Sequence, residues 1–286
     1  MHGVQAKSIL SQSNGINVYR GCTHGCIYCD SRSSCYGFKH DFEDIAVKTN
    51  APELLERALR AKRKRCMIGT GAMCDPYIPQ ERELKLTRRC LEIIRRYDFG
   101  AAVQTKSDLV LRDIDLLSDI NRSTKAVVQM TLTTYDDSLC RVIEPNVCVT
   151  SRRFEALCEL KRAGIPTVVW LCPLLPYIND TKENILGIVD YAARVGCVGI
   201  ITFGMGLTLR DGSRQHFYDA LDRHFLTLRE RYQRSFGNSY EIPSPRSGEL
   251  WAAFTAACEK AGLEYRTQRL FEYLHEFPQP QQLSLL

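Results

Sequence analysis

The sequence has no long apolar segment. Its longest apolar run, residues 168–175, contains Pro173 and is far too short to cross a lipid bilayer. The residues at the start of the chain hold no apolar region of the kind found in secretory signals. We therefore expect a cytoplasmic protein that does not enter a membrane.

Repeats are also absent, and the only low-complexity tract is the tail, which is rich in proline and glutamine and is expected to fray from about residue 278. The net charge of +5 is modest for a chain of 286 residues. With 44% hydrophobic and 25% charged residues, the composition is typical of a globular protein. The length allows one large core or two small domains.

Cysteine, in contrast, is plentiful, with 13 in the chain. Most of these cysteines lie singly, and several fall within apolar segments such as residues 66–68 and 171–172. In a reducing compartment such cysteines behave as small buried hydrophobic residues. Only one group is closely spaced, and it is the candidate for metal binding.

The closely spaced group is Cys22, Cys26 and Cys29, with the spacing C-x3-C-x2-C in a loop at residues 21–30. A 4Fe-4S cube takes four ligands, so three thiolates on one loop leave one iron open to an outside molecule. A zinc knuckle completed by Cys35 is the alternative, although zinc fingers usually supply a second close pair of ligands. His24, inside the loop, stays unassigned.

Short apolar runs alternate with longer amphipathic stretches, which predicts a parallel sheet with crossover helices. The six expected strands lie at residues 15–20, 66–68, 101–104, 126–133, 167–171 and 198–203. Six such strands form an α/β fold, a partial (βα)6 TIM-like barrel, with its active site at the C-terminal ends of the strands. We assign residues 1–205 to this core and residues 206–286 to a helical C-terminal extension. Helices are expected at about residues 81–97, from Asp180 or Thr181 onward, and within the extension at residues 216–234 and 249–261.

Three segments carry a resemblance to a known family, namely residues 17–22, 69–77 and 104–107. Together with Tyr28 before the third cysteine, they resemble the radical S-adenosylmethionine (SAM) enzymes, in the branch that contains spore photoproduct lyase. The resemblance covers roughly residues 15–205 and implies the same partial barrel. It also implies that a 4Fe-4S cluster, reduced by a low-potential donor such as flavodoxin or ferredoxin, cleaves SAM to a 5′-deoxyadenosyl radical. This radical would take a hydrogen from an unidentified substrate.

The resemblance also implies roles for individual residues. Cys22, Cys26 and Cys29 would bind the cluster, and Cys74 would return a hydrogen atom to the product. The residues expected to contact SAM are Tyr28, Gly69, Thr70, Gly71, Lys106, Thr131 and Thr133. Without the family context, the glycines fit a tight turn, the lysine a solvated strand end and the threonines an ordinary strand.

The chain departs from the lyase at two positions. The lyase has its thiol three residues before the matching aspartate, where this chain has Ala72, and it has a tyrosine where this chain has Asp30. Asp75 itself precedes a proline and fits a turn. Both departures count against repair of spore photoproduct as the reaction.

Four basic runs provide the second alternative, a zinc-bound nucleic-acid-binding protein without catalysis. They are residues 62–65, 88–89, 95–96 and 152–153. A basic stripe would bind phosphates, but charges on the outer face of a helix are usually only solvated. Nucleic acid is therefore a possible partner, and the oligomeric state is not predicted.

Overall fold

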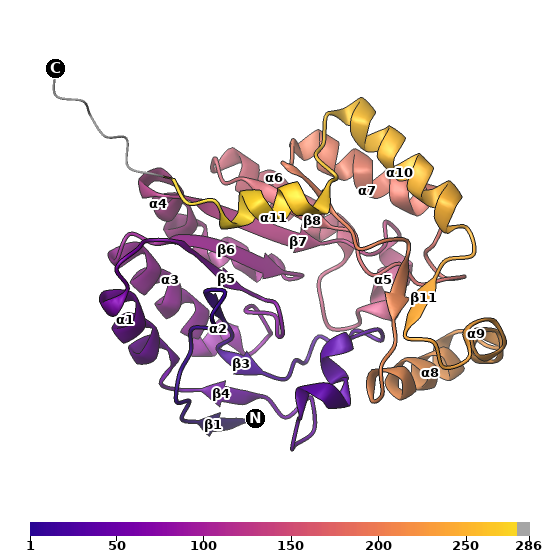
Figure 1. Ribbon diagram of the computed structural model, residues 1–286, viewed down its shortest axis with the longest axis horizontal. Coiled ribbons are helices and arrows are strands. Elements are labelled where there is room, and N and C mark those ends of the chain that lie inside the picture. The colour runs from indigo at the N-terminus through magenta and orange to yellow at the C-terminus, as the bar shows by residue number, and fades with distance from the viewer. Residues whose placement is uncertain (279–286) are drawn as a thin grey trace.

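A computed structural model describes residues 1–278, which are built around a six-stranded parallel sheet (Figure 1). The strands follow one another in the order β2-β5-β6-β7-β8-β9. They are β2 (Gly15–Ile16), β5 (Met67–Thr70), β6 (Gly100–Thr105), β7 (Ala126–Thr131), β8 (Thr167–Trp170) and β9 (Gly199–Ile201). The predicted partial (βα)6 barrel is confirmed, whereas the tail that was expected to fray lies almost wholly outside the described residues.

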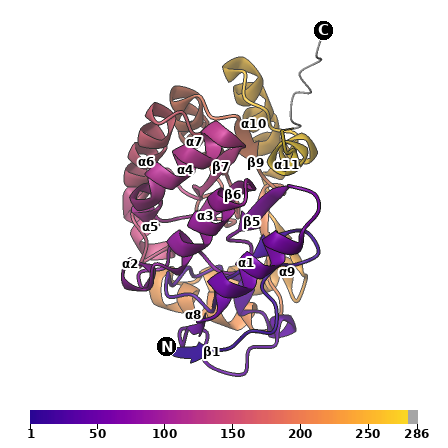
Figure 2. The ribbon, with the colours of Figure 1, turned by 90° about the vertical axis from the view of Figure 1, so that its left-hand side faces the viewer.

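The outer face of the sheet is covered by the crossover helices, which lie along one side of it in Figure 2. Ala101, Val103 and Val128 point from the strands into the large apolar cluster that these helices complete. Alternate residues of a strand face opposite sides of the sheet, so every second residue packs against the layer of helices. The helices are α1 (Ala51–Ala61), α3 (Leu86–Arg96), α4 (Ile114–Ser123), α6 (Thr150–Arg162) and α7 (Lys182–Val195).

The inner face of the sheet is covered by α11 (Thr267–His275), a helix that the sequence pattern did not predict. Leu270 and Leu274 of this helix form a separate apolar cluster with inner-face residues of five strands. These strand residues are Met67, Ala102, Val127, Val168 and Ile201. Helix α11 thus fills the interior of the barrel and leaves the C-terminal ends of the strands to form a cavity.

The first predicted strand, residues 15–20, is in fact two strands. Only β2 joins the main sheet, and β3 (Tyr19–Arg20) pairs antiparallel with β4 (Ala46–Lys48) in a small second sheet that also contains β1 (His2–Val4). Tyr19 is buried, and its hydroxyl donates a hydrogen bond to Glu81. The chain turns away from the barrel after β2, which brings the cysteine loop over the ends of the strands.

The helix predicted at residues 81–97 is also divided. Helix α2 (Glu81–Leu84) and helix α3 are separated by Lys85, which adopts a left-handed conformation with φ of 51°. The buried carboxylate of Glu81 accepts a hydrogen bond from the backbone N–H of Thr87 in the first turn of α3, at 3.1 Å. The break therefore lets a buried acid satisfy one of the free amides at the start of the longer helix.

The residues after 205 add an antiparallel strand pair and three further helices to the fold. The pair is β10 (Gly206–Thr208) with β11 (Glu241–Pro243), and the helices are α8 (Ser213–His224), α9 (Leu228–Phe236) and α10 (Ser247–Ala261). The single helix expected at residues 216–234 is α8 and α9, divided near Thr227, whose φ is 72°. Phe217 and Leu221 of α8 pack in one apolar cluster with Cys26 and Ile27, so this extension supports the cysteine loop.

The polar cap of α7 leads to a first testable prediction. Asp180 or Thr181 was expected to begin this helix, and the hydroxyl of Thr181 accepts a hydrogen bond from the backbone N–H of Asn184 at 3.1 Å. Replacing Thr181 by alanine should lower the free energy of unfolding by about 1 kcal/mol, the usual effect of losing such a cap. Thermal unfolding under anaerobic conditions measures the change. Thr255→Ala, inside α10, is the control and should cause no loss, since alanine favours a helix interior.

No helix among residues 1–278 combines the length and the apolar character that crossing a membrane would need.

Candidate active site

A cavity of about 660 Å³ lies at the C-terminal ends of the barrel strands. The loop that carries the three spaced cysteines borders it, as do the loops that follow β5, β6, β8 and β9. Several residues singled out in the sequence line this cavity, namely Cys22, Cys26, Tyr28, Cys29, Gly71, Cys74, Lys106 and Thr131. The structure therefore brings together residues from four separate segments of the chain.

Two glycines allow the loops to approach each other closely. Gly21 has a φ of 96°, and a Cβ atom at this position would lie 2.4 Å from the carbonyl oxygen of Phe42. Gly71 has a φ of 98°, and a Cβ atom there would lie 2.1 Å from the carbonyl oxygen of Gln104. Both positions therefore require glycine on two grounds, the left-handed backbone and the lack of space.

The three spaced cysteines fit a cluster with one open iron. All three thiols face the same cavity, and burial raises the pKa of Cys26 and of Cys29. In a 4Fe-4S cube each thiolate binds its own iron, so the sulfurs stand around a volume and do not converge on one point. Three thiols around one volume match a cube with three protein ligands. The rest of the cavity is free for an outside ligand.

A four-cysteine zinc site does not fit. Zinc needs four ligands at about 2.3 Å from one ion, and no group of three or more Cys, His, Asp or Glu side chains within residues 1–278 is placed to hold a metal ion. Cys35 is exposed and accepts a hydrogen bond from Arg210 at 3.4 Å, away from the cavity lining. The zinc alternative thus lacks its fourth ligand.

Cys74 lies directly beside the cysteine loop. Its thiol is buried and donates a hydrogen bond to the carbonyl oxygen of Gly21 at 2.7 Å. The neighbouring thiol of Cys74 lowers the pKa of Cys22, and the same interaction together with burial raises the pKa of Cys74. Cys74 is therefore protonated at neutral pH and faces the candidate ligand Cys22.

Asp75 does far more than form a turn. Its Oδ1 accepts hydrogen bonds from the hydroxyl of Thr105 at 2.7 Å and from the backbone N–H of Tyr77 at 2.8 Å. Its Oδ2 accepts one from the backbone N–H of Lys106 at 2.7 Å and lies 3.6 Å from Nδ1 of His24. One carboxylate thus ties together the loop after β5, the end of β6 and the cysteine loop.

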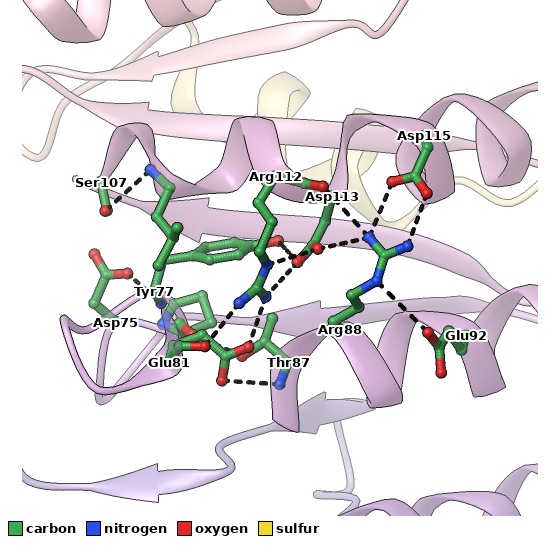
Figure 3. Close-up of polar contacts among 12 residues, drawn as sticks. Asp75, Tyr77, Glu81, Thr87, Arg88, Glu92, Ser107, Arg112, Asp113 and Asp115 are labelled. Carbon is green, nitrogen blue, oxygen red and sulfur yellow. Dashed lines mark hydrogen bonds and ion pairs between the residues drawn. The ribbon is translucent and has the colours of Figure 1, made fainter. Parts of the chain in front are cut away.

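A second polar network supports Asp75 and its hydrogen-bond partners (Figure 3). Tyr77 donates a hydrogen bond from its hydroxyl to Asp113 at 3.0 Å, and Arg112 bridges Asp113 and Glu81 with contacts of 2.7 Å. Asp113 and Glu81 are fully buried. Arg88 completes the network by pairing with Asp113 at 2.9 Å. Buried carboxylates need such partners, and here the partners fix the segment that follows Asp75.

Lys106 supplies a positive charge to the cavity. Burial opposes its charged form, but the nearby groups Cys26, Glu144 and Asp75 raise the pKa of Lys106 overall. Its ammonium lies 5.9 Å from the centre of the Tyr28 ring. The side chain is thus a cation at neutral pH, placed to attract an anionic group of a bound ligand.

Three of the residues expected to contact SAM lie away from the cavity lining. Gly69 and Thr70 are within β5, where they pair with Gly15 and Ile16 of β2. Thr133 follows the end of β7 and is fully buried, and its hydroxyl donates a hydrogen bond to Glu144 at 3.2 Å. Gly71 and Thr131 are the neighbouring positions that do line the cavity.

Other residues at the site were not singled out in the sequence. Trp170 and Phe203 form an aromatic wall at the ends of β8 and β9, with ring centres 5.6 Å apart, and Phe203 is 66% exposed. Both lie in register with the inner-face residues Val168 and Ile201, so the strand pattern could have identified them. Cys172 also lines the cavity, and burial raises its pKa to about 12.

The comparison with protein families agrees with this geometry. The description "Radical SAM superfamily" matches residues 16–182, which is more than half of the chain. The chain belongs to the radical SAM superfamily. Membership implies a 4Fe-4S cluster and SAM as cofactors, and the arrangement of the three cysteines is compatible with both.

The relatives of this radical SAM protein include two uncharacterised proteins. An uncharacterised protein of Methanocaldococcus jannaschii is 33% identical over 175 residues, covering 60% of this chain and 64% of that protein. An uncharacterised protein of Mycobacterium tuberculosis is 26% identical over 239 residues, covering 80% of this chain and 68% of that protein. Both alignments cover more than half of this chain.

Among solved structures, spore photoproduct lyase complexed with dinucleoside spore photoproduct has a TM-score of 0.66. The match covers 91% of this chain and 78% of the lyase at 15% identity. At this identity the likeness concerns the fold, and it extends into the residues after 205. The radical SAM partial barrel is thus confirmed.

Proposed function

We propose that the protein reductively cleaves SAM at a 4Fe-4S cluster held by Cys22, Cys26 and Cys29, and that the resulting radical takes a hydrogen from a substrate in the same cavity. The observation that carries this proposal is that three thiols of one loop share a cavity with residues at the ends of β5, β6, β7, β8 and β9. When bound, the cluster supplies the electron that breaks the sulfur–carbon bond of SAM. The chain's own residues bind and orient the two ligands.

The contacts to SAM follow from the charges and shapes around the loop. Lys106 is a cation and would bind the carboxylate of the methionine part. Gly71 allows the backbone to approach the ligand closely, and the Tyr28 ring offers a flat surface to the adenine. Thr131 would donate a hydrogen bond to the ribose.

The substrate would occupy the part of the cavity bordered by Trp170 and Phe203. An exposed aromatic ring stacks well on a planar group and helps to exclude water from a reactive intermediate. This placement supports a substrate with a planar ring or an apolar face. It leaves the identity of the reaction on that substrate open to direct screening.

A narrower proposal is that the substrate is DNA containing a thymine dimer. It is favoured by the fold shared with spore photoproduct lyase and by the thiol of Cys74 beside the cluster loop. The basic runs give it less support, because Arg88, Arg96 and Arg152 are each held in ion pairs with neighbouring carboxylates. Incubation with a dimer-bearing oligonucleotide tests it, and an unchanged lesion would rule it out.

The main proposal is tested by anaerobic reconstitution with iron and sulfide, followed by reduction with dithionite in the presence of SAM. The expected result is about four irons per chain and formation of 5′-deoxyadenosine. Replacing dithionite by reduced flavodoxin or ferredoxin tests the proposed electron donors. A fully loaded cluster that leaves SAM intact would overturn the proposal, and one bound zinc without iron would favour the non-catalytic alternative.

A further inference from the structure

The short segment at residues 143–146 begins at the last residue of α5 (Asp137–Ile143) and holds the cysteine loop along much of its length. The carbonyl oxygen of Ile143 accepts a hydrogen bond from the N–H of Ile27 at 3.0 Å. The backbone N–H of Asn146 donates one to the carbonyl oxygen of His24 at 3.1 Å. The side-chain amide of Asn146 donates another to the carbonyl oxygen of Thr23 at 2.8 Å. This segment thus fixes the backbone between the first and third cysteines.

Glu144, in the middle of this segment, joins the same loop through its side chain. Its Oε1 accepts hydrogen bonds from the hydroxyls of Tyr28 and Thr133. Its Oε2 lies 2.6 Å from Nη1 of Arg153 on α6. Both oxygens are therefore engaged, one with the ring that faces the cavity and one with a buried cation.

The pair of Glu144 and Arg153 is completely enclosed, since neither side chain has any exposed surface. Arg153 is in turn fixed by the carbonyl oxygens of Thr131 at 3.0 Å and Cys148 at 2.9 Å. A charge pair without access to water is expensive to bury, and a hydrophobic pair of similar volume often stabilises a fold better. A contribution to stability thus explains the pair poorly. The contact of Glu144 with the Tyr28 hydroxyl explains it better, because that contact fixes the position of the tyrosine.

We propose that Glu144 is a positioning residue, which Arg153 holds in place so that its carboxylate fixes the Tyr28 ring at the cavity wall for contact with SAM. The inference rests on the proposed function and goes beyond it, because it assigns the orientation of the SAM-facing ring to a buried ion pair outside the cysteine motif. Apolar neighbours pack around the buried Tyr28 side chain, and the bond from its hydroxyl to Glu144 is the polar contact that fixes where the far end of the ring lies. Glu144 acts through Tyr28 and does not touch the ligand.

The experiment compares the reconstituted wild-type protein with Tyr28→Phe, Glu144→Gln and the double variant. Equilibrium dialysis measures SAM binding, and iron analysis measures cluster loading. Tyr28→Phe keeps the ring and the fold, and it should retain the iron content of the wild type while weakening SAM binding by about tenfold, the loss expected for one hydrogen bond to a charged group. Glu144→Gln should weaken SAM binding at least as much, because it removes the negative charge that binds both Arg153 and the Tyr28 hydroxyl.

The double variant separates positioning from a merely structural role. If the Tyr28 hydroxyl works only through Glu144, the double variant should bind SAM about as weakly as Glu144→Gln alone, since the effects of coupled residues do not add. Asp180→Asn is the matched control: it also alters a buried carboxylate, which accepts hydrogen bonds from Ser244 and from the backbone N–H of Tyr177, but it lies outside the cavity lining and should leave SAM affinity unchanged.

Each outcome is decisive. Wild-type affinity in Tyr28→Phe, with full iron loading, would overturn the positioning role, as would additive losses in the double variant. If Glu144→Gln fails to fold, Tyr28→Phe still tests the inference by itself. Failure of the wild-type protein to load iron or bind SAM would instead reject the proposed function on which the inference depends.

Discussion

Replacing Cys26 by alanine should leave a folded chain that loads less than four irons and forms no measurable 5′-deoxyadenosine. Cys26 is buried, lines the cavity and is the central member of the three-cysteine loop. Loss of a partner that merely supports a metal ligand costs about 10- to 100-fold in metal affinity or activity. Loss of a ligand itself should therefore reduce SAM cleavage by more than about 100-fold. Iron analysis and chromatography of the products after dithionite reduction measure both effects.

The matched control for this prediction is Cys35→Ala. Cys35 is nearby in sequence but exposed and outside the cavity lining. Its removal should leave iron content and SAM cleavage at the level of the wild type. Equal losses in both variants would contradict the assignment of a three-cysteine cluster and would favour a site that includes Cys35.

The strands and helices of the barrel could be predicted because their patterns are local. Apolar runs separated by amphipathic stretches predicted all six strands of the sheet, and Thr181, one of the two residues expected to begin α7, is its N-cap. The division of the first strand was missed because β3 pairs with β4, and the paired residues Arg20 and Ala46 lie 26 positions apart in the chain. Likewise, the break at Lys85 depends on Glu81, whose buried carboxylate is satisfied only in the folded protein.

The site could be predicted where its functional residues lie close together in the sequence. The cysteine spacing placed Cys22, Cys26 and Cys29 in one loop, and the structure brings their side chains to one cavity. The partnership of Glu144 and Arg153 left no such signal. The run at residues 152–153 gave the appearance of a solvated basic face, yet Arg153 is fully buried, whereas Arg152 is 40% exposed. Only the packing of α6 against the loop after α5 distinguishes the two arginines.

The same pair of arginines provides the last prediction. Replacing Arg153 by methionine should lower the free energy of unfolding by about 3–5 kcal/mol, because it leaves the carboxylate of Glu144 buried without its cation. Arg152→Met is the control. It removes only ion pairs at the surface, so it should cost no more than about 1 kcal/mol. Thermal unfolding of both variants under anaerobic conditions measures the difference, and equal losses would contradict the importance of the buried pair.

The pH dependence of the stability lost in Arg153→Met identifies the cause of that loss. In the wild type, burial opposes ionisation of Glu144, but Arg153 and Lys106 hold its pKa below the ordinary value of 4.5. A lowered pKa contributes stability that is present above the unfolded value and is lost as the pH falls through the folded value. Without Arg153, burial should raise the pKa of Glu144 above 4.5, so that its protonation relieves the buried charge. The deficit of Arg153→Met relative to the wild type should therefore shrink as the pH is lowered from about 8 toward 5, since the variant takes up a proton on Glu144 that the wild type does not. A deficit independent of pH would instead indicate lost packing of the arginine side chain.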